Sequence, residues 1–173
     1  PDLSDAIVDR AMFHTDNAYY LPAATITGHR WFQNTASNTA YRGFGGPQGM
    51  MLAEQMLDDI ARSLGKDPLL IRQANLYGQD ERDERTITPY HQTVKGVDLT
   101  RIIDELVGSS DYWARRETIR KDNQESLKNG GRYIKGLALT PVKFGISFTA
   151  MFLNQAGALI HIYTDGTVQV SHG

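Results

Sequence analysis

The chain has 173 residues, of which 40% are hydrophobic and 22% are charged, and its formal net charge is −2. This balance suits one globular domain or the parts of two, and it argues against a nucleic-acid or anionic-membrane partner. Cysteine is absent, which excludes disulfides, thiolate zinc sites and cysteine-held iron–sulfur clusters from this chain and fits a cytoplasmic location. No run approaches the roughly 20 apolar residues that a membrane-spanning helix needs.

The first third of the chain is predicted to begin with a short helix and an extended segment. Residues 4–15 have an apolar side, and Ser4 suits the capping position before it. Residues 19–32 are rich in strand-forming side chains. A longer helix is predicted from Pro47 to about Leu64, ending at Gly65. Residues at helical spacing predict its apolar face: Ala53, Leu57, Ile60 and Leu64.

The middle of the chain is predicted to be helical. Helices are expected from residue 67 to near Gly78, from Asp98 to Gly108, and over the charged residues 111–127. The second of these has an i, i+3, i+4, i+7 apolar stripe, made of Leu99, Ile102, Ile103 and Leu106.

The pattern changes after Gly131. Residues 132–142 and 156–163 favour strands, and Asp165-Gly166 predicts a hairpin turn. We therefore expect an α+β fold in two parts, a mixed unit over residues 1–131 and the start of a β-rich unit over residues 132–173. Because the chain begins at Pro1 and stops within a predicted strand, it is expected to be a fragment.

The glycine cluster at residues 43–46 is the sharpest local feature. Glycines let a ligand approach the backbone closely, and a following helix start offers N–H groups to an oxyanion. Phe44 could then face a flat substrate. On pattern alone, the favoured interpretation is a plain tight turn with Phe44 in the core. The cluster matches neither a phosphate-binding loop nor a dinucleotide fingerprint.

Two further features suggest a ligand site. In residues 143–149, Phe148 could stack on a planar ring and the Thr149 hydroxyl could bind it, although a bent strand with core aromatics is favoured on pattern alone. Arg10 could bind a carbonyl or carboxylate, but an arginine in such a helix is more often a surface ion-pair partner. The five histidines show no metal-ligand spacing.

Three strings resemble signatures of the xanthine dehydrogenase and aldehyde oxidase family. They are residues 9–17 (DRAMFHTDN), residues 39–50 (TAYRGFGGPQGM), and residues 143–149 with 152–158 (KFGISFT and FLNQAGA). Their order and spacing fit the family, and the resemblance covers nearly the whole chain. It implies a fragment of the molybdopterin-binding domains of such an enzyme.

The resemblance also implies residue roles. Arg42 and Gly43 would contact the cofactor, with the Arg42 backbone against the molybdenum and no direct metal ligand in this chain. Phe44 and Phe148 would sandwich the substrate, one face-on and one edge-on, with Thr149 beside it. Arg10 would contact a purine oxygen and stabilise charge in the transition state, which favours xanthine dehydrogenase over aldehyde oxidase.

The implied reaction oxidises hypoxanthine and xanthine to urate in purine catabolism, with water as the oxygen source. Electrons would pass through 2Fe-2S clusters to FAD and on to NAD, all held in other domains or subunits, and protomers would form a homodimer. The general-base glutamate is expected outside the chain, so the 173-residue chain is predicted to be inactive alone. The alternatives are an aldehyde oxidase-like or other N-heterocycle hydroxylase and, remotely, a nucleic-acid-binding module.

Overall fold

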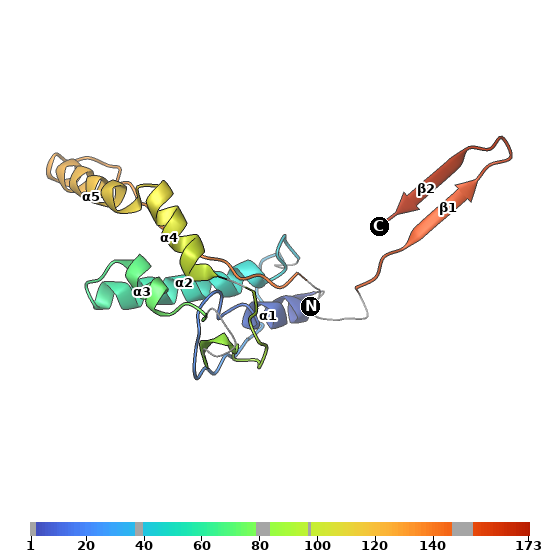
Figure 1. Cartoon of the computed structure of the whole chain (residues 1–173), viewed down its shortest axis with the longest axis horizontal. Coiled ribbons are helices and arrows are strands. Elements are labelled where there is room, and N and C mark those ends of the chain that lie inside the picture. The colour runs from blue at the N-terminus through green and yellow to red at the C-terminus, as the bar shows by residue number, and fades with distance from the viewer. Residues whose placement is uncertain (1–2, 37–39, 79–83, 97, 147–153) are drawn as a thin grey trace.

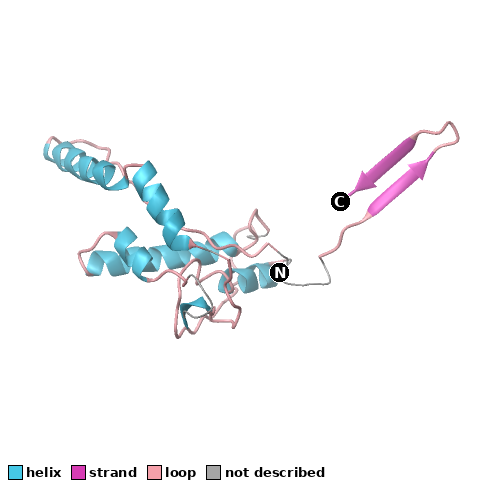
Figure 2. Ribbon diagram, in the orientation of Figure 1, coloured by secondary structure: helices cyan, strands magenta, loops and turns pink. Residues whose placement is uncertain are grey.

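A computed structural model describes residues 3–36, 40–78, 84–96, 98–146 and 154–173. Figure 1 shows a helical part, with the N-terminus at its edge, and a β-hairpin that projects away from it. Over the described residues the chain contains five α-helices, a short 3-10 helix and one two-stranded sheet (Figure 2). The predicted α+β fold class is therefore confirmed.

The described helices and strands follow the chain in the predicted order. They are α1 (Ser4–Met12), α2 (Gly46–Ser63), α3 (Pro68–Ala74), η1 (Glu84–Thr86), α4 (Leu99–Ser109), α5 (Tyr112–Lys128), β1 (Ala158–Ile162) and β2 (Val168–His172). Gly65 has a φ of 61° just after α2, as expected for a left-handed helix stop. The Asp98 side chain caps α4 by accepting from Arg101 N–H at 2.9 Å. The predicted Ser4 cap is wrong, because Leu3 occupies the capping position and no side chain caps α1.

The buried core combines residues of α2, α3 and α4 with Tyr19, Leu76 and their neighbours, and α1 contacts α2 beside it. On α2 the buried stripe is Ala53, Leu57 and Ala61, each four residues apart. The predicted face is half wrong, since Ile60 is 39% and Leu64 58% exposed. A stripe that begins and ends with alanine lets neighbouring helices approach closely, and it leaves the larger side chains at its flank outside the contact.

Two glycines allow α1 to cross the start of α2 at very short range. A Cβ on Gly45 would lie 2.0 Å from the Ile7 carbonyl oxygen, and one on Gly49 would lie 2.1 Å from the Ala11 oxygen. Gly45 also has a φ of 98°, which favours glycine. This crossing fixes the end of α1 beside the glycine turn that starts α2.

The extended segment 19–32, rich in strand-forming side chains, and the predicted strand over residues 132–142 form no strand in the described chain. The only pairing in the first is an isolated bridge between Tyr19 and Leu76, and no described strand falls in the second. Strand propensity needs a partner strand, and neither segment has one among the described residues. Residues 137–141 instead cross the helical core in extended form, with Leu139 buried against it.

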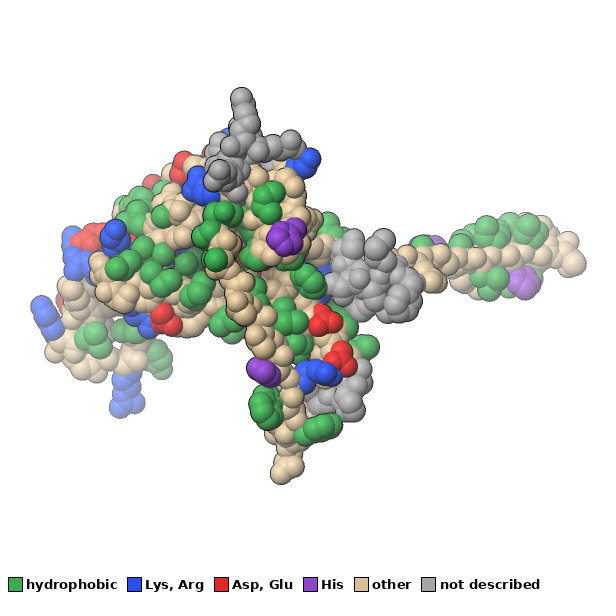
Figure 3. Space-filling model, turned by 90° about the horizontal axis from the view of Figure 1, so that it is seen from below, with side chains coloured by type: hydrophobic (Ala, Val, Ile, Leu, Met, Phe, Trp, Pro, Cys, Tyr) green, Lys and Arg blue, Asp and Glu red, His purple; other side chains and the backbone are tan. Residues whose placement is uncertain are grey.

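The predicted hairpin turn is confirmed. Strands β1 and β2 are antiparallel, with Ile162 opposite Val168, and Asp165 Oδ1 accepts from Thr167 N–H at 2.9 Å across the turn. Both strands are exposed on both faces, and Figure 3 shows apolar side chains along the projecting hairpin. Within the described part of the chain, no helix has the length and apolar character that a bilayer crossing requires.

Candidate functional site

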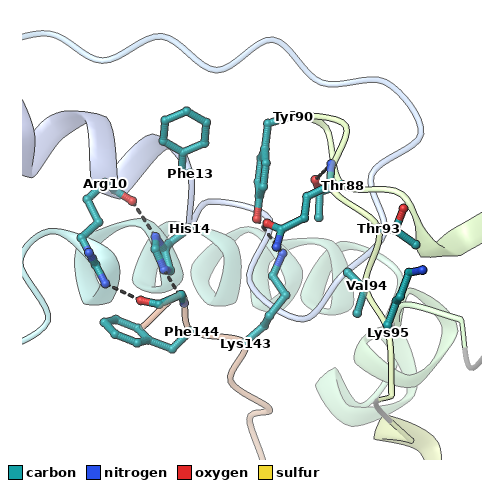
Figure 4. Close-up of a pocket in the computed structure, with 12 residues that line it drawn as sticks. Arg10, Phe13, His14, Thr88, Tyr90, Thr93, Val94, Lys95, Lys143 and Phe144 are labelled. Carbon is teal, nitrogen blue, oxygen red and sulfur yellow. Dashed lines mark hydrogen bonds between the residues drawn. The ribbon is translucent and has the colours of Figure 1, made fainter. Parts of the chain in front are cut away.

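A cavity of about 650 Å³ lies where the end of α1, residues 88–95 and residues 143–145 meet (Figure 4). Its lining residues are Arg10, Phe13, His14, Thr88, Tyr90, Gln92, Thr93, Val94, Lys95, Lys143, Phe144 and Gly145. These segments are far apart in sequence, and none of them is a strand in this structure. The cavity therefore combines aromatic rings with positively charged side chains, a lining that suits a planar ligand carrying negative charge.

Arg10 lies in the last turn of α1 and is 4% exposed. Its guanidinium Nη2 donates a hydrogen bond to the Gly145 carbonyl oxygen. Its central carbon lies 4.9 Å from the centroid of the Phe144 ring, within cation–π range. The interpretation of Arg10 as a surface ion-pair partner is therefore wrong, because the side chain is buried on the wall of the cavity.

His14 follows Arg10 by one helical turn and uses both of its ring nitrogens. Nδ1 lies 2.7 Å from the Arg10 carbonyl oxygen, and Nε2 lies 3.0 Å from the Gly145 amide nitrogen. A carbonyl oxygen only accepts and an amide N–H only donates, so Nδ1 carries the proton and Nε2 is the acceptor. His14 is thus neutral and in a single tautomer in this geometry.

The charge environment of His14 agrees with its neutral state. Burial lowers the pKa of His14 below 6.5, and the positive charges of Arg10 and Lys143 lower it further. The backbone hydrogen bond with Arg10 and the negative charge of Asp16 act in the opposite direction without overcoming the burial.

A buried ion pair lies next to this group. Asp16 Oδ2 accepts from the Lys143 ammonium and, at 2.5 Å, from the Tyr77 hydroxyl. The Lys143 Nζ also donates to the Tyr90 hydroxyl at 3.1 Å. Burial, and then the hydrogen bond to Asp16, raise the pKa of Tyr77 well above its ordinary value, so its hydroxyl remains a donor.

Asn17 ties the same region to α2. It adopts a φ of 45°, and its Nδ2 donates to Glu54 at 2.8 Å and to the Pro141 carbonyl at 3.0 Å. Its Oδ1 accepts from the Lys143 amide at 3.1 Å. The Tyr19 hydroxyl donates to the same Glu54 oxygen at 2.6 Å. The wall of the cavity is therefore held by a continuous set of polar contacts.

The remaining predicted site residues lie elsewhere. Arg42 is exposed, while Gly43 and Phe44 are half-buried with φ values of 91° and 50°. None of these three lines the described cavity. Phe148 and Thr149 lie outside the described residues. Of the predicted site residues that the structure describes, only Arg10 lies on the cavity wall.

The turn before α2 fits one wall of a site for an anionic cofactor. Hydrogen bonds from Phe44 N–H to the Tyr41 oxygen, at 2.7 Å, and from Gly46 N–H to the Gly43 oxygen, at 3.0 Å, close it. A Cβ on Gly43 would lie 2.6 Å from the Pro47 ring, so this position requires glycine, and the exposed Arg42 next to it adds positive charge to the turn. Among the described residues, no group of three or more histidine, aspartate or glutamate side chains could hold a metal ion directly.

Two molybdopterin cofactor-binding domain families match the chain, one over residues 1–76 and the other over residues 105–173. The chain is also 46% identical to a xanthine dehydrogenase/oxidase of Gallus gallus over 173 residues. The chain belongs to the molybdopterin-binding part of the xanthine dehydrogenase family. Xanthine dehydrogenase 1 of Arabidopsis thaliana is 45% identical and the xanthine dehydrogenase of Dictyostelium discoideum is 43% identical. Each alignment covers 99% of this chain and 12% of the relative.

Sequence reasoning recognised the family but missed part of the site. His14, Asp16 and Lys143 lie within the strings that resemble the family, yet the reasoning gave none of them a role. Of the three, His14 alone had a local signal in the sequence, because it stands four residues after Arg10 and shares its predicted helical face. Gly145, which contacts both residues, lies 131 or more positions away, beyond the reach of local patterns. The domain boundary near residue 131 stays a prediction.

Proposed function

We propose that the chain forms part of the substrate pocket and cofactor site of a molybdenum hydroxylase that oxidises hypoxanthine and xanthine to urate. The names of its relatives, xanthine dehydrogenase and xanthine dehydrogenase/oxidase, support this proposal. The chain spans 12% of their length, so the activity of the whole protein, its substrates and its partners are all part of the proposal.

The observation that carries the purine assignment is the position of Arg10. Its guanidinium borders a cavity of about 650 Å³ that is also lined by aromatic rings. A planar guanidinium aimed at a ring carbonyl gains interaction energy as negative charge develops there, which lowers the barrier of the reaction. The Gly145 carbonyl and the Phe144 ring hold this group in place, so little reorganisation accompanies the reaction.

The turn at Arg42 and Gly43 is the proposed contact with the molybdopterin cofactor. When bound, that cofactor supplies the oxygen-transfer and redox chemistry of the family. The residues of this chain would bind and orient the purine. Phe44 and Phe148 are proposed to hold its ring face-on and edge-on, as aromatic rings hold flat heterocycles, and Thr149 is proposed to bind its edge.

The rest of the electron path is proposed to lie outside this chain. Iron–sulfur clusters, FAD and NAD would be bound by other domains or subunits of a cytoplasmic enzyme that forms a homodimer. The general base is also assigned to another part of the enzyme, so the isolated chain is expected to be inactive with added cofactor. Turnover of xanthine by the isolated chain would contradict this assignment.

The test of the purine assignment is Arg10→Met in the full-length enzyme. We expect kcat/KM for xanthine to fall about 100-fold or more, the range for loss of one group that stabilises transition-state charge, while turnover of an aromatic aldehyde falls far less. Arg30→Met is the matched control, because Arg30 is 53% exposed and paired with Asp5 at the surface. Equal losses for both substrates in Arg10→Met would favour an aldehyde oxidase-like enzyme.

A further inference from the structure

A closed circuit of three hydrogen bonds joins Arg10, His14 and Gly145. His14 Nδ1–H donates to the Arg10 carbonyl, the Gly145 N–H donates to His14 Nε2, and the Arg10 guanidinium donates to the Gly145 carbonyl. Figure 4 shows the His14 imidazole beside Arg10 at the end of α1, near Phe144, with hydrogen bonds between the drawn residues dashed. The His14 ring thus connects the main chain of Arg10 to the amide of Gly145, the residue whose carbonyl accepts from the Arg10 side chain.

We propose that His14 is a positioning residue that fixes the Arg10 guanidinium at the cavity, and that it does so only as the neutral Nδ1–H imidazole. This inference rests on the proposed function in one respect, the contact of Arg10 with substrate. It assigns His14 no contact with substrate or cofactor.

The Gly145 backbone lies outside every described helix and strand. Residues 132–146 form no helix or strand in the described chain. Regular backbone hydrogen bonds therefore do not fix the distance between Gly145 and α1. Its amide is held by His14 Nε2 at 3.0 Å. On the far side, the Lys143 amide is held by Asn17 Oδ1 at 3.1 Å. Loss of the His14 acceptor would remove the hydrogen bond of the Gly145 amide and leave the Arg10 guanidinium contact at its carbonyl.

The packing of the Phe144 ring supports the same role for His14. The Phe144 ring lies 5.1 Å from the His14 ring and 4.9 Å from the Arg10 guanidinium carbon. Phe144 therefore packs against both members of the circuit. A shift of Gly145 would move Phe144 with it, so the hydrogen-bond acceptor and the aromatic face that hold Arg10 would be displaced together.

The protons on the groups around His14 also require a neutral ring. A second proton on His14 would place an N–H at Nε2 opposite the Gly145 N–H, two donors with no acceptor between them. It would also add positive charge beside Arg10 and Lys143, with Lys95 on the same cavity. Asp16 is the negative group that faces the ring, and it is already paired with Lys143. Tyr90 lines the same cavity, and α2 approaches the ring through Gly46, which has no charge. Burial lowers the pKa of His14 in agreement with this geometry.

Two substitutions in the full-length enzyme test separately the two hydrogen bonds made by the His14 imidazole. His14→Gln keeps an acceptor near the position of Nε2 and does not titrate. His14→Asn keeps a donor near the position of Nδ1 but is too short to reach Gly145. We expect kcat/KM for xanthine at pH 8 to stay within about 3-fold of wild type in His14→Gln and to fall about 10-fold or more in His14→Asn, as expected for loss of a hydrogen bond that holds a catalytic group.

The pH profile adds a readout that a purely structural role would not change. Wild-type kcat/KM should fall on the acid side as His14 gains its second proton, and in His14→Gln this decline should move to lower pH. An acid limb at the same pH in both proteins would overturn the inference. The His14→Gln profile decides the question even if His14→Asn fails to fold, and thermal unfolding and molybdenum content check both variants.

Hydrogen–deuterium exchange of a peptide covering residues 143–146 provides a readout that needs no substrate. At pH 8 this peptide should exchange at least 5-fold faster in His14→Asn than in wild type. At pH 5 it should exchange faster in wild type than in His14→Gln. An unchanged exchange rate in His14→Asn would overturn the role proposed for His14. It would not contradict the proposal that the enzyme oxidises xanthine. An enzyme that prefers aldehydes but shows the expected exchange would instead contradict only the proposed substrate.

Discussion

The Lys143 ammonium and the Asp16 carboxylate form an ion pair across 127 positions of the sequence. The Asp16 side chain is 1% exposed and that of Lys143 23% exposed. The Lys143 Nζ also lies 4.7 Å from the centroid of the Tyr77 ring and 5.3 Å from that of Tyr90. This pair links the segment that carries Phe144 and Gly145 to the turn after α1. It therefore stabilises the wall of the cavity.

Asp16→Asn is expected to destabilise the structure strongly. The substitution removes the negative charge that faces a largely buried ammonium, and breaking a buried pair in this way costs about 3 kcal/mol. For a unit of this size the unfolding midpoint would fall by roughly 6 to 12 °C. Asp122→Asn is the control, because Asp122 pairs with Lys135 at the exposed surface, where a pair is worth about 0 to 1 kcal/mol. Similar shifts in the two variants, measured by thermal unfolding, would contradict the structural role of the Asp16 pair.

The crossing of α1 over α2 makes a steric prediction. Gly45→Ala would place a Cβ 2.0 Å from the Ile7 carbonyl oxygen at a φ of 98°, so we expect a loss of about 3 kcal/mol or more. Gly108→Ala, in α4, meets nothing within 4 Å and should stabilise the helix by up to about 1 kcal/mol. Opposite signs in denaturant or thermal unfolding of the two variants would support the observed crossing, and a neutral Gly45→Ala would contradict it.

Glu54 is expected to be the most sensitive acidic residue of α2. It accepts from the Arg72 Nε at 2.6 Å, and Arg72 is 3% exposed. Burial and the Glu54 contacts raise the pKa of Tyr19, so the Tyr19 hydroxyl donates to the same carboxylate. Glu54→Gln should therefore cost about 3 kcal/mol by leaving a buried cation with Asp58 as its one remaining ion-pair partner within the described chain. Glu105→Gln, in an exposed pair with Arg101, should change the unfolding midpoint very little.

Stability should depend on pH through His14. Its folded pKa is lowered below the unfolded value of 6.5, so below that pH the unfolded chain binds the proton more readily than the folded chain. The stabilisation is fully present above pH 6.5 and is lost as the pH falls toward the folded pKa. Above pH 6.5, the unfolding midpoints of wild type and His14→Gln should therefore change with pH in nearly the same way. The wild-type unfolding midpoint should drop more steeply than that of His14→Gln below it, and parallel curves would contradict the neutral assignment.

Local sequence signals accounted for the helices, the hairpin turn and the fold class. The Asp98 cap, the Gly65 stop and the Asp165-Gly166 turn each depend on a few adjacent residues, and each is observed. Residues 19–32 and 132–142 have strand-like composition but no partner within the described chain. Pairing depends on segments far away or outside the chain, and composition does not specify it.

The candidate site was predictable only through the family resemblance. Arg10 looked like a surface residue because its pattern on α1 does not reveal what covers that face. Its burial results from Phe144 and Gly145, which lie about 135 positions later. His14 showed no metal spacing, and its role appears only when both of its ring nitrogens are matched to their partners.

The most direct test of the account is turnover by the full-length enzyme with xanthine and with an aromatic aldehyde, measured side by side as NAD reduction. A strong preference for xanthine is expected if the Arg10 guanidinium on the cavity wall has its proposed role of stabilising charge on a purine oxygen. A preference for the aldehyde would contradict the purine assignment, although the chain would still belong to the same molybdopterin-binding family.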